Sequence, residues 1–68
     1  MRTRLKRERQ LAGLTQQQLA VRIGVSQQTI SKYESEIITP GQFKTIRELE
    51  KLFSVEAEEL FPDVFLNS

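Results

Sequence analysis

Hydrophobic residues recur along the chain at helical spacing, in short runs separated by glycine and proline. No stretch alternates apolar and polar residues as a half-buried strand would, and no segment repeats. The breaks are Gly13, Gly24 and the cluster at 39–41. The pattern predicts an all-α fold, a compact bundle of five helices, of which the first covers about residues 3–12. At this length we expect one domain over residues 1–68.

The second predicted helix has the clearest local signature, because a complete capping box precedes it. The Thr15 hydroxyl can accept the backbone N–H of Gln18, and the Gln18 side chain can bond back to the N–H of Thr15. The helix then runs to Ile23. Gly24 can end it, since glycine adopts the left-handed conformation at no steric cost.

A third helix follows almost at once, over about residues 26–35, with Ser26 as its cap. Two helices joined by so short a turn must cross closely to form a helix-turn-helix. Ala20 fits the crossing point, because a larger side chain there would push the helices apart. Gly24 makes the turn, and Ile30 belongs to the shared core. The sequence therefore predicts a helix-turn-helix.

The remaining helices are predicted from a further capping pattern and from proline. Thr39 is the expected cap of the fourth helix, with Pro40 at its first position and Gln42 closing the box. A fifth helix, at about residues 56–61, stops at Pro62. The expected core includes three phenylalanines: Phe43, Phe53 and Phe61. The short tail at 63–68 either folds back on the domain or offers a partner surface through Val64, Phe65 and Leu66.

Composition argues against an enzyme. The 68 residues include no cysteine and no histidine, so the common general bases, nucleophiles and transition-metal ligands are missing. We expect no metal site and no cofactor. No apolar run approaches the length of a membrane span, and the basic start lacks the apolar stretch of a signal peptide, so we expect a cytoplasmic protein.

The net charge of +1 is uninformative, but its distribution is not. Residues 1–34 carry seven basic and two acidic side chains, whereas residues 35–68 carry three basic and seven acidic ones. This asymmetry suggests a polyanionic partner for the first half, although a solvated basic helix would look the same. We expect the basic start to contribute general attraction rather than specific contacts; its residues are Arg2, Arg4, Lys6 and Arg7.

The outer face of the third predicted helix has no acidic residue before Glu34, unlike a helix that merely faces water. Its exposed positions are uncharged or positive and can form hydrogen bonds: Gln27, Gln28, Thr29, Ser31 and Lys32. Together with its surroundings, the stretch GLTQQQLAVRIGVSQQTISKYE resembles the helix-turn-helix of the phage-repressor and Xre-type transcriptional regulators. The likeness covers nearly the whole chain, and the closing VEAEELFPD is similar to the fifth helix of that lambda-repressor-like fold.

The resemblance implies a role for each matching residue. Gln16 corresponds to a phosphate contact, Gln27 and Gln28 to base-reading positions, and Lys32 to a contact with base or backbone. Residues 39–44 correspond to a loop and helix start that grip a second phosphate. The candidate DNA-binding residues are Gln16, Ser26, Gln27, Gln28, Thr29, Lys32, Thr39, Gln42 and Lys44.

Elementary chemistry agrees with these roles. A glutamine amide presents a donor and an acceptor side by side, which suits N7 and N6 of adenine in the major groove. Helix N-termini offer free N–H groups to phosphate.

The resemblance also implies that Arg9 and Glu34 tie the first helix to the third, although Arg9 could reach a phosphate as well. For Gln17 and Gln18 we expect no DNA contact.

Two departures from the family pattern concern turns. Glu36 and Ser54 stand where the family often has glycine, so we expect these two turns to be built differently.

The leading functional hypothesis is a sequence-specific DNA-binding transcriptional regulator that acts as a repressor. The alternatives are an antitoxin-type interaction module that also binds its own promoter, and a helical scaffold without DNA binding. One recognition helix reads only a few base pairs, so we expect a homodimer on a palindromic operator. Its predicted dimer surface is the C-terminal region: Ala57, Phe61, Val64, Phe65 and Leu66.

Overall fold

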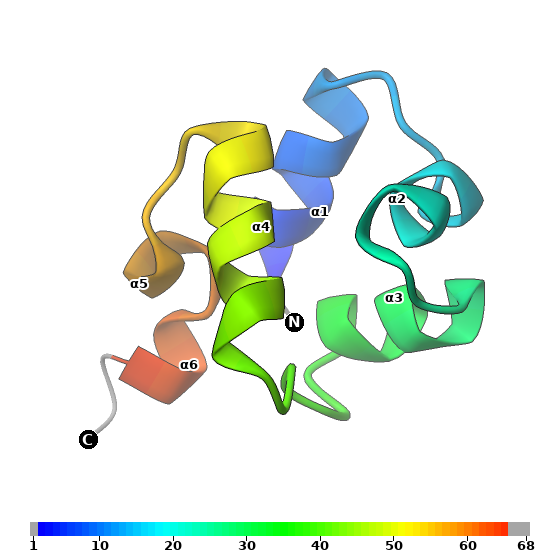
Figure 1. Ribbon diagram of the computed structural model, residues 1–68. Helices are drawn as coiled ribbons and strands as arrows, with labels where there is room; N and C mark the ends of the chain where they lie inside the picture. The colour runs from blue at the N-terminus through cyan, green and yellow to red at the C-terminus, as the bar shows by residue number, and fades with distance from the viewer. Residues whose placement is uncertain (1, 66–68) are drawn as a thin grey trace.

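The computed structural model describes residues 2–65, and within that range the chain forms six helices and no strand. They are α1 (Thr3–Leu11), α2 (Gln16–Ile23), α3 (Gln27–Glu34), α4 (Phe43–Phe53), α5 (Ala57–Leu60) and α6 (Pro62–Phe65). Helices α2 and α3 pack together at one end of the molecule, α4, α5 and α6 occupy the other, and α1 lies between them (Figure 1). The predicted all-α fold is confirmed.

The prediction of five helices is wrong by one. Pro62 was expected only to stop the fifth helix, but it also begins a sixth, α6. Its missing N–H costs nothing at a first helical position, where that group has no intrahelical partner. Phe65 at the end of α6 packs against the core, so this part of the tail folds back on the domain. Leu66 lies outside the described residues.

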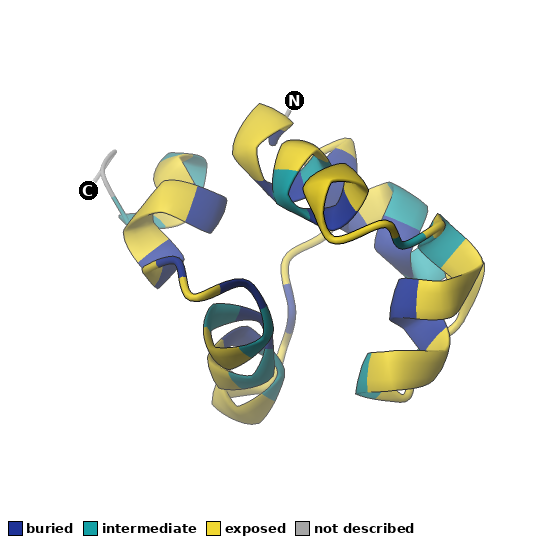
Figure 2. Ribbon diagram, turned by 90° about the horizontal axis from the view of Figure 1, so that it is seen from above, coloured by how far each residue is buried: buried dark blue, intermediate teal, exposed yellow. Residues whose placement is uncertain are grey.

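The core is a single cluster to which every helix but α6 contributes a buried hydrophobic side chain. Leu19, Leu49, Leu60 and Phe61 are fully enclosed. The other members are Leu5, Ala20, Ile30, Tyr33, Ile46, Phe53, Val55 and Ala57. Figure 2 shows these buried positions turned toward the centre of the molecule, with exposed positions on the outer face of each helix.

Four helix ends close in the same way, through a residue in the left-handed conformation. These residues are Gly13, Gly24, Glu36 and Ser54, with φ of 74°, 76°, 65° and 55°. After each one, the next backbone N–H reaches back five residues to a carbonyl, at 3.1, 2.9, 3.0 and 3.3 Å in chain order, as in a Schellman motif. The expectation that the turns at Glu36 and Ser54 differ is therefore wrong. The backbone keeps the turn and accepts a side chain in a conformation that favours glycine.

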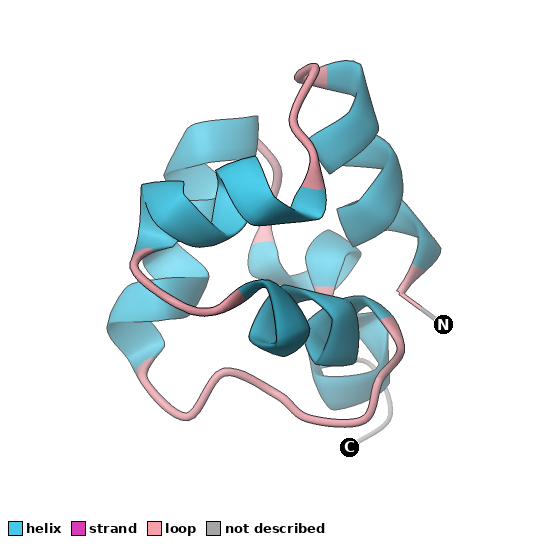
Figure 3. Cartoon of the chain, turned by 90° about the vertical axis from the view of Figure 1, so that its right-hand side faces the viewer, coloured by secondary structure: helices cyan, strands magenta, loops and turns pink. Residues whose placement is uncertain are grey.

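The start of α4 differs from the prediction. The helix begins at Phe43, and its cap residue Gln42 makes no side-chain hydrogen bond to the helix. The capping box expected for Thr39 is absent, because α4 begins three residues later than predicted, and the Thr39 hydroxyl accepts a hydrogen bond from Arg2. Phe43 is 69% exposed rather than part of the core. Residues 35–42 consequently form the longest connection in the described part of the chain, running along the outside of the molecule from α3 to α4 (Figure 3).

Candidate nucleic-acid interface

The helix-turn-helix is built by α2, α3 and the three residues that join them. Its crossing point is closely packed, since Ala20 and Ile30 are each 1% exposed. The capping box at the start of α2 is present: the Thr15 N–H donates to Gln18 Oε1 at 2.9 Å, and the Gln18 N–H donates to Thr15 Oγ1 at 3.1 Å. Gly24 makes the turn through its positive φ. A Cβ built at Gly24 would meet no atom within 4 Å, so backbone conformation rather than space favours glycine here.

The first turn of α3 presents its two glutamine side chains to solvent. Gln27 and Gln28 are exposed, and the first turns of α2 and α3 contain no acidic residue. Ser26 and Thr29 are occupied with each other: the Thr29 N–H donates to Ser26 Oγ at 3.1 Å, and their hydroxyl oxygens lie 2.9 Å apart. Lys32 is exposed one turn further along. The two glutamine amides and one ammonium group are thus the groups on this face best placed to reach outward.

A buried ion pair fixes α1 to α3. Arg9 Nε donates to Glu34 Oε2 at 2.6 Å, and Arg9 Nη1 donates to the carbonyl of Leu14 at 2.8 Å. Gln16 Nε2 adds a hydrogen bond to Glu34 Oε1 at 3.1 Å. The start of α2 is therefore held to the end of α3, and the half-buried amide of Gln16 has a defined orientation at the N-terminus of α2.

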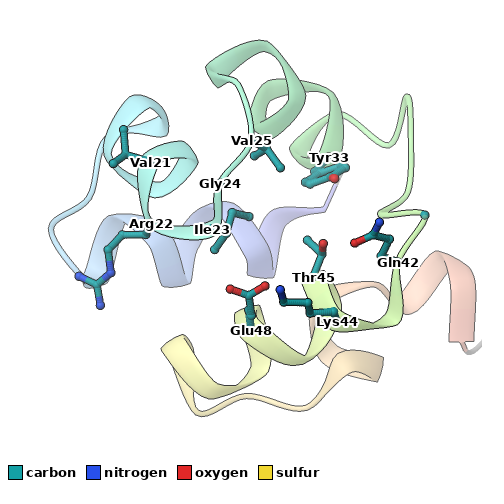
Figure 4. A pocket seen from close by; sticks show the side chains of 11 residues that line it. Val21, Arg22, Ile23, Gly24, Val25, Tyr33, Gln42, Lys44, Thr45 and Glu48 are labelled. Carbon is teal, nitrogen blue, oxygen red and sulfur yellow. The ribbon is translucent and has the colours of Figure 1, made fainter.

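The loop and the first turn of α4 supply the remaining sequence-predicted residues. Thr39, Gln42 and Lys44 are exposed. Gln42 and Lys44 border an open cleft of about 640 Å³, which separates the α2–α3 turn from the start of α4 (Figure 4). Figure 4 shows Ile23 and Val25 on the opposite wall and Tyr33 at one side. Burial raises the pKa of the Tyr33 phenol, so the hydroxyl in this wall is neutral at physiological pH.

Sequence reasoning missed Arg2, whose side chain is buried and fully engaged. Arg2 Nη1 donates to the carbonyls of Tyr33 and Ile38, both at 2.7 Å, and Nη2 donates to Thr39 Oγ1 at 2.8 Å. Nε and Nη2 together hold both carboxylate oxygens of Asp63, at 3.0 and 2.8 Å. The expectation that Arg2 contributes only general positive charge is wrong.

The Arg2 guanidinium also lies over the ring of Phe61, 4.8 Å from its centroid. Its hydrogen bonds to the Asp63 carboxylate lower the pKa of that group below its ordinary value. The sequence carried no local signal for this site, because Arg2 and Asp63 stand 61 positions apart. The Arg2 position looks like one more basic residue in a basic segment.

Two members of the predicted dimer surface are unavailable. Ala57 is 6% exposed and Phe61 is 0% exposed, since both belong to the chain's own core. Of that surface, Val64 is 40% exposed and Phe65 is half-buried.

Two kinds of feature are absent from residues 2–65. No helix there is long and apolar enough to cross a membrane. The same residues contain no group of three carboxylate side chains arranged to hold a metal ion.

Comparison with known proteins agrees with this geometry. The family model described as helix-turn-helix matches residues 5–60, from α1 to the end of α5. No curated protein and no solved structure gave a match. The matched range contains the capped α2, the Gly24 turn and the exposed glutamines of α3. The chain belongs to the Xre/lambda-repressor-like family of helix-turn-helix proteins, which are DNA-binding regulators and generally not enzymes.

Proposed function

We propose that this regulator binds double-stranded DNA sequence-specifically, with α3 in the major groove and with Gln27 and Gln28 reading base edges. The observation that carries the proposal is the exposed first turn of α3, where two amides project from a helix N-terminus without an acidic residue. An amide of this kind matches N6 and N7 of adenine. We further propose that the protein is a cytoplasmic repressor, which would act by occupying a promoter site that RNA polymerase needs.

Contacts to the DNA backbone would flank this helix on both sides. On one side, the N-terminus of α2 and the oriented amide of Gln16 offer N–H groups to a phosphate. On the other side, Thr39, Gln42 and Lys44 offer a hydroxyl, an amide and an ammonium group. Such contacts fix the position of the protein on the duplex, while the glutamines discriminate between sequences.

We also propose that two protomers bind one palindromic operator. Two recognition helices related by a two-fold axis would contact half-sites about 34–36 Å apart, one turn of B-DNA. Because Ala57 and Phe61 are buried, a C-terminal dimer surface would be centred on α6, where Val64 is exposed.

Selection of DNA sites in vitro, followed by binding measurements on the selected duplex and on random DNA, tests the reading of bases. Gln27→Ala or Gln28→Ala should lower the discrimination between the two DNAs by about 1–3 kcal/mol and leave the circular dichroism spectrum unchanged. Gln17→Ala is the matched control, because Gln17 is exposed on α2 and is expected to contact no DNA. Unchanged discrimination in both α3 variants would refute base reading by this helix.

A further inference from the structure

We infer that Arg2 is a positioning residue for DNA binding: it holds the α3–α4 loop in the geometry that contacts the DNA backbone, and Asp63 in α6 orients Arg2 for this task. The inference rests on the proposed function. Arg2 cannot itself touch a phosphate, because it is only 2% exposed. Its effect on DNA must pass through the groups that it binds.

Arg2 joins the two ends of the turn that leaves α3. Nη1 donates both to the Tyr33 carbonyl in the last turn of α3 and to the Ile38 carbonyl in the loop. The Arg2 backbone N–H donates to the Glu34 carbonyl at 2.9 Å. The Tyr33 carbonyl also accepts the Glu36 N–H at 3.3 Å, so the bonds from Arg2 add to the closure of the helix end, and they place a cation at the negative end of α3. One residue thereby fixes where the loop begins.

The bond to Thr39 determines what the loop can offer to DNA. A hydroxyl has one hydrogen to donate and oxygen lone pairs that accept. Arg2 Nη2 donates to Thr39 Oγ1, so the hydroxyl oxygen acts as the acceptor and its hydrogen can point outward, where Thr39 is exposed. A cationic donor also polarises the hydroxyl and strengthens it as a donor. A phosphate oxygen is the acceptor that fits.

Asp63 and Phe61 leave the guanidinium little freedom to turn. The carboxylate binds Nε and Nη2 in a fork geometry, and the ring of Phe61 lies against the guanidinium at 4.8 Å. Helix α6, which carries none of the proposed DNA contacts, is thereby connected to the loop that does. A lysine could keep the charge but could not span these partners with one planar group.

The test uses Arg2→Lys, with Arg7→Lys as a matched control. Both replace arginine by lysine near the N-terminus and keep the charge, but Arg7 is exposed. Affinity for the selected duplex is measured at a temperature at which circular dichroism shows every variant to be folded. We expect Arg2→Lys to bind about tenfold more weakly, the equivalent of one charge-assisted hydrogen bond, and Arg7→Lys to bind as the parent does. A lower melting temperature with unchanged affinity would make Arg2 merely structural and overturn the inference.

A double-mutant cycle with Thr39→Val tests the route. If Arg2 acts through the Thr39 hydroxyl, Arg2→Lys should cost less affinity in the Thr39→Val background than in the parent. An equal loss in both backgrounds would overturn that route. Should Arg2→Lys fail to fold, Asp63→Asn tests the same inference, because it weakens the bonds that orient Arg2. A folded Asp63→Asn protein with the parent's affinity would contradict the role of α6. If the parent itself binds no selected duplex, the proposed function fails; if the parent binds and Arg2→Lys binds equally well, only this inference fails.

Discussion

Arg9 Nε lies 2.6 Å from Glu34 Oε2, in a pair whose side chains are 9% and 2% exposed. Both charged groups are buried away from water, so each is stabilised by its partner. Removing one partner of such a pair costs about 3–5 kcal/mol, whereas replacing both with apolar residues can be nearly neutral. Glu34→Leu should therefore be far less stable than the parent, and Arg9→Met combined with Glu34→Leu should regain much of the loss. Urea denaturation measures both, and a double variant no more stable than Glu34→Leu would contradict this view of the pair.

Ser54 offers a stabilising substitution. Its φ of 55° closes the end of α4 in the left-handed region, which costs a residue other than glycine about 1–2 kcal/mol. Ser54→Gly should relieve part of this strain and raise the melting temperature, at about 4–8 °C for each kcal/mol in a domain of this size. Ser54→Ala is the control, because alanine carries the same Cβ. Equal melting temperatures for the two variants would show that the turn is not strained.

The parts of the fold that depend on neighbours in sequence could be predicted. The capping box of Thr15 and the turn at Gly24 are set by residues within a few positions of each other, and both formed as expected. The start of α4 was not predictable in the same way. Thr39 has the right neighbours for a cap, but α4 begins at Phe43, and the Thr39 hydroxyl accepts a hydrogen bond from Arg2, 37 positions away.

Phe43 shows a second limit of sequence patterns. It follows helical spacing with Ile46 and Leu49, which are buried, but it is the first residue of α4 and lies beyond the edge of the core. Its ring instead lies beneath the Arg47 guanidinium, 5.7 Å from the ring centroid. Periodicity indicates which side of a helix faces inward. It does not indicate how far along the helix the core extends.

The proposed phosphate contact of Lys44 predicts a change in salt dependence. If Lys44 neutralises one phosphate, Lys44→Ala should lower the slope of log K against log salt concentration by about one, for every DNA sequence. Lys51→Ala is the control, since Lys51 is exposed in the last turn of the same helix. Fluorescence anisotropy at several salt concentrations measures the slopes. The same slope in both variants and the parent would place Lys44 away from the backbone.

Asp63 should make stability depend on pH. Hydrogen bonds from Arg2 lower the pKa of its carboxyl in the folded state, so its contribution is complete above the unfolded pKa and is lost as the pH falls through the folded pKa. Other carboxylates titrate over the same range, so the comparison is with Asp63→Asn. The parent should exceed Asp63→Asn in free energy of unfolding at neutral pH, and the gap should narrow well below pH ~3.9, the ordinary Asp value. If the difference in free energy of unfolding between the parent and Asp63→Asn stayed constant at acidic pH, the charge of Asp63 would not be its cause.

The proposed dimer makes the last prediction, which concerns α6. At saturation, sedimentation should show two protomers on a palindromic duplex and a single protomer on a duplex with one half-site. Val64→Ser should weaken pairing on DNA without unfolding the protein, because Val64 is exposed whereas Phe65 packs against the core. Phe43→Ser is the control: it removes an even more exposed apolar side chain, 69% against 40%, at the start of α4. Reduced cooperativity in Val64→Ser alone would place the contact on α6, and loss in Phe43→Ser alone would move it to α4. One protomer per palindromic duplex at saturation would refute the dimer itself.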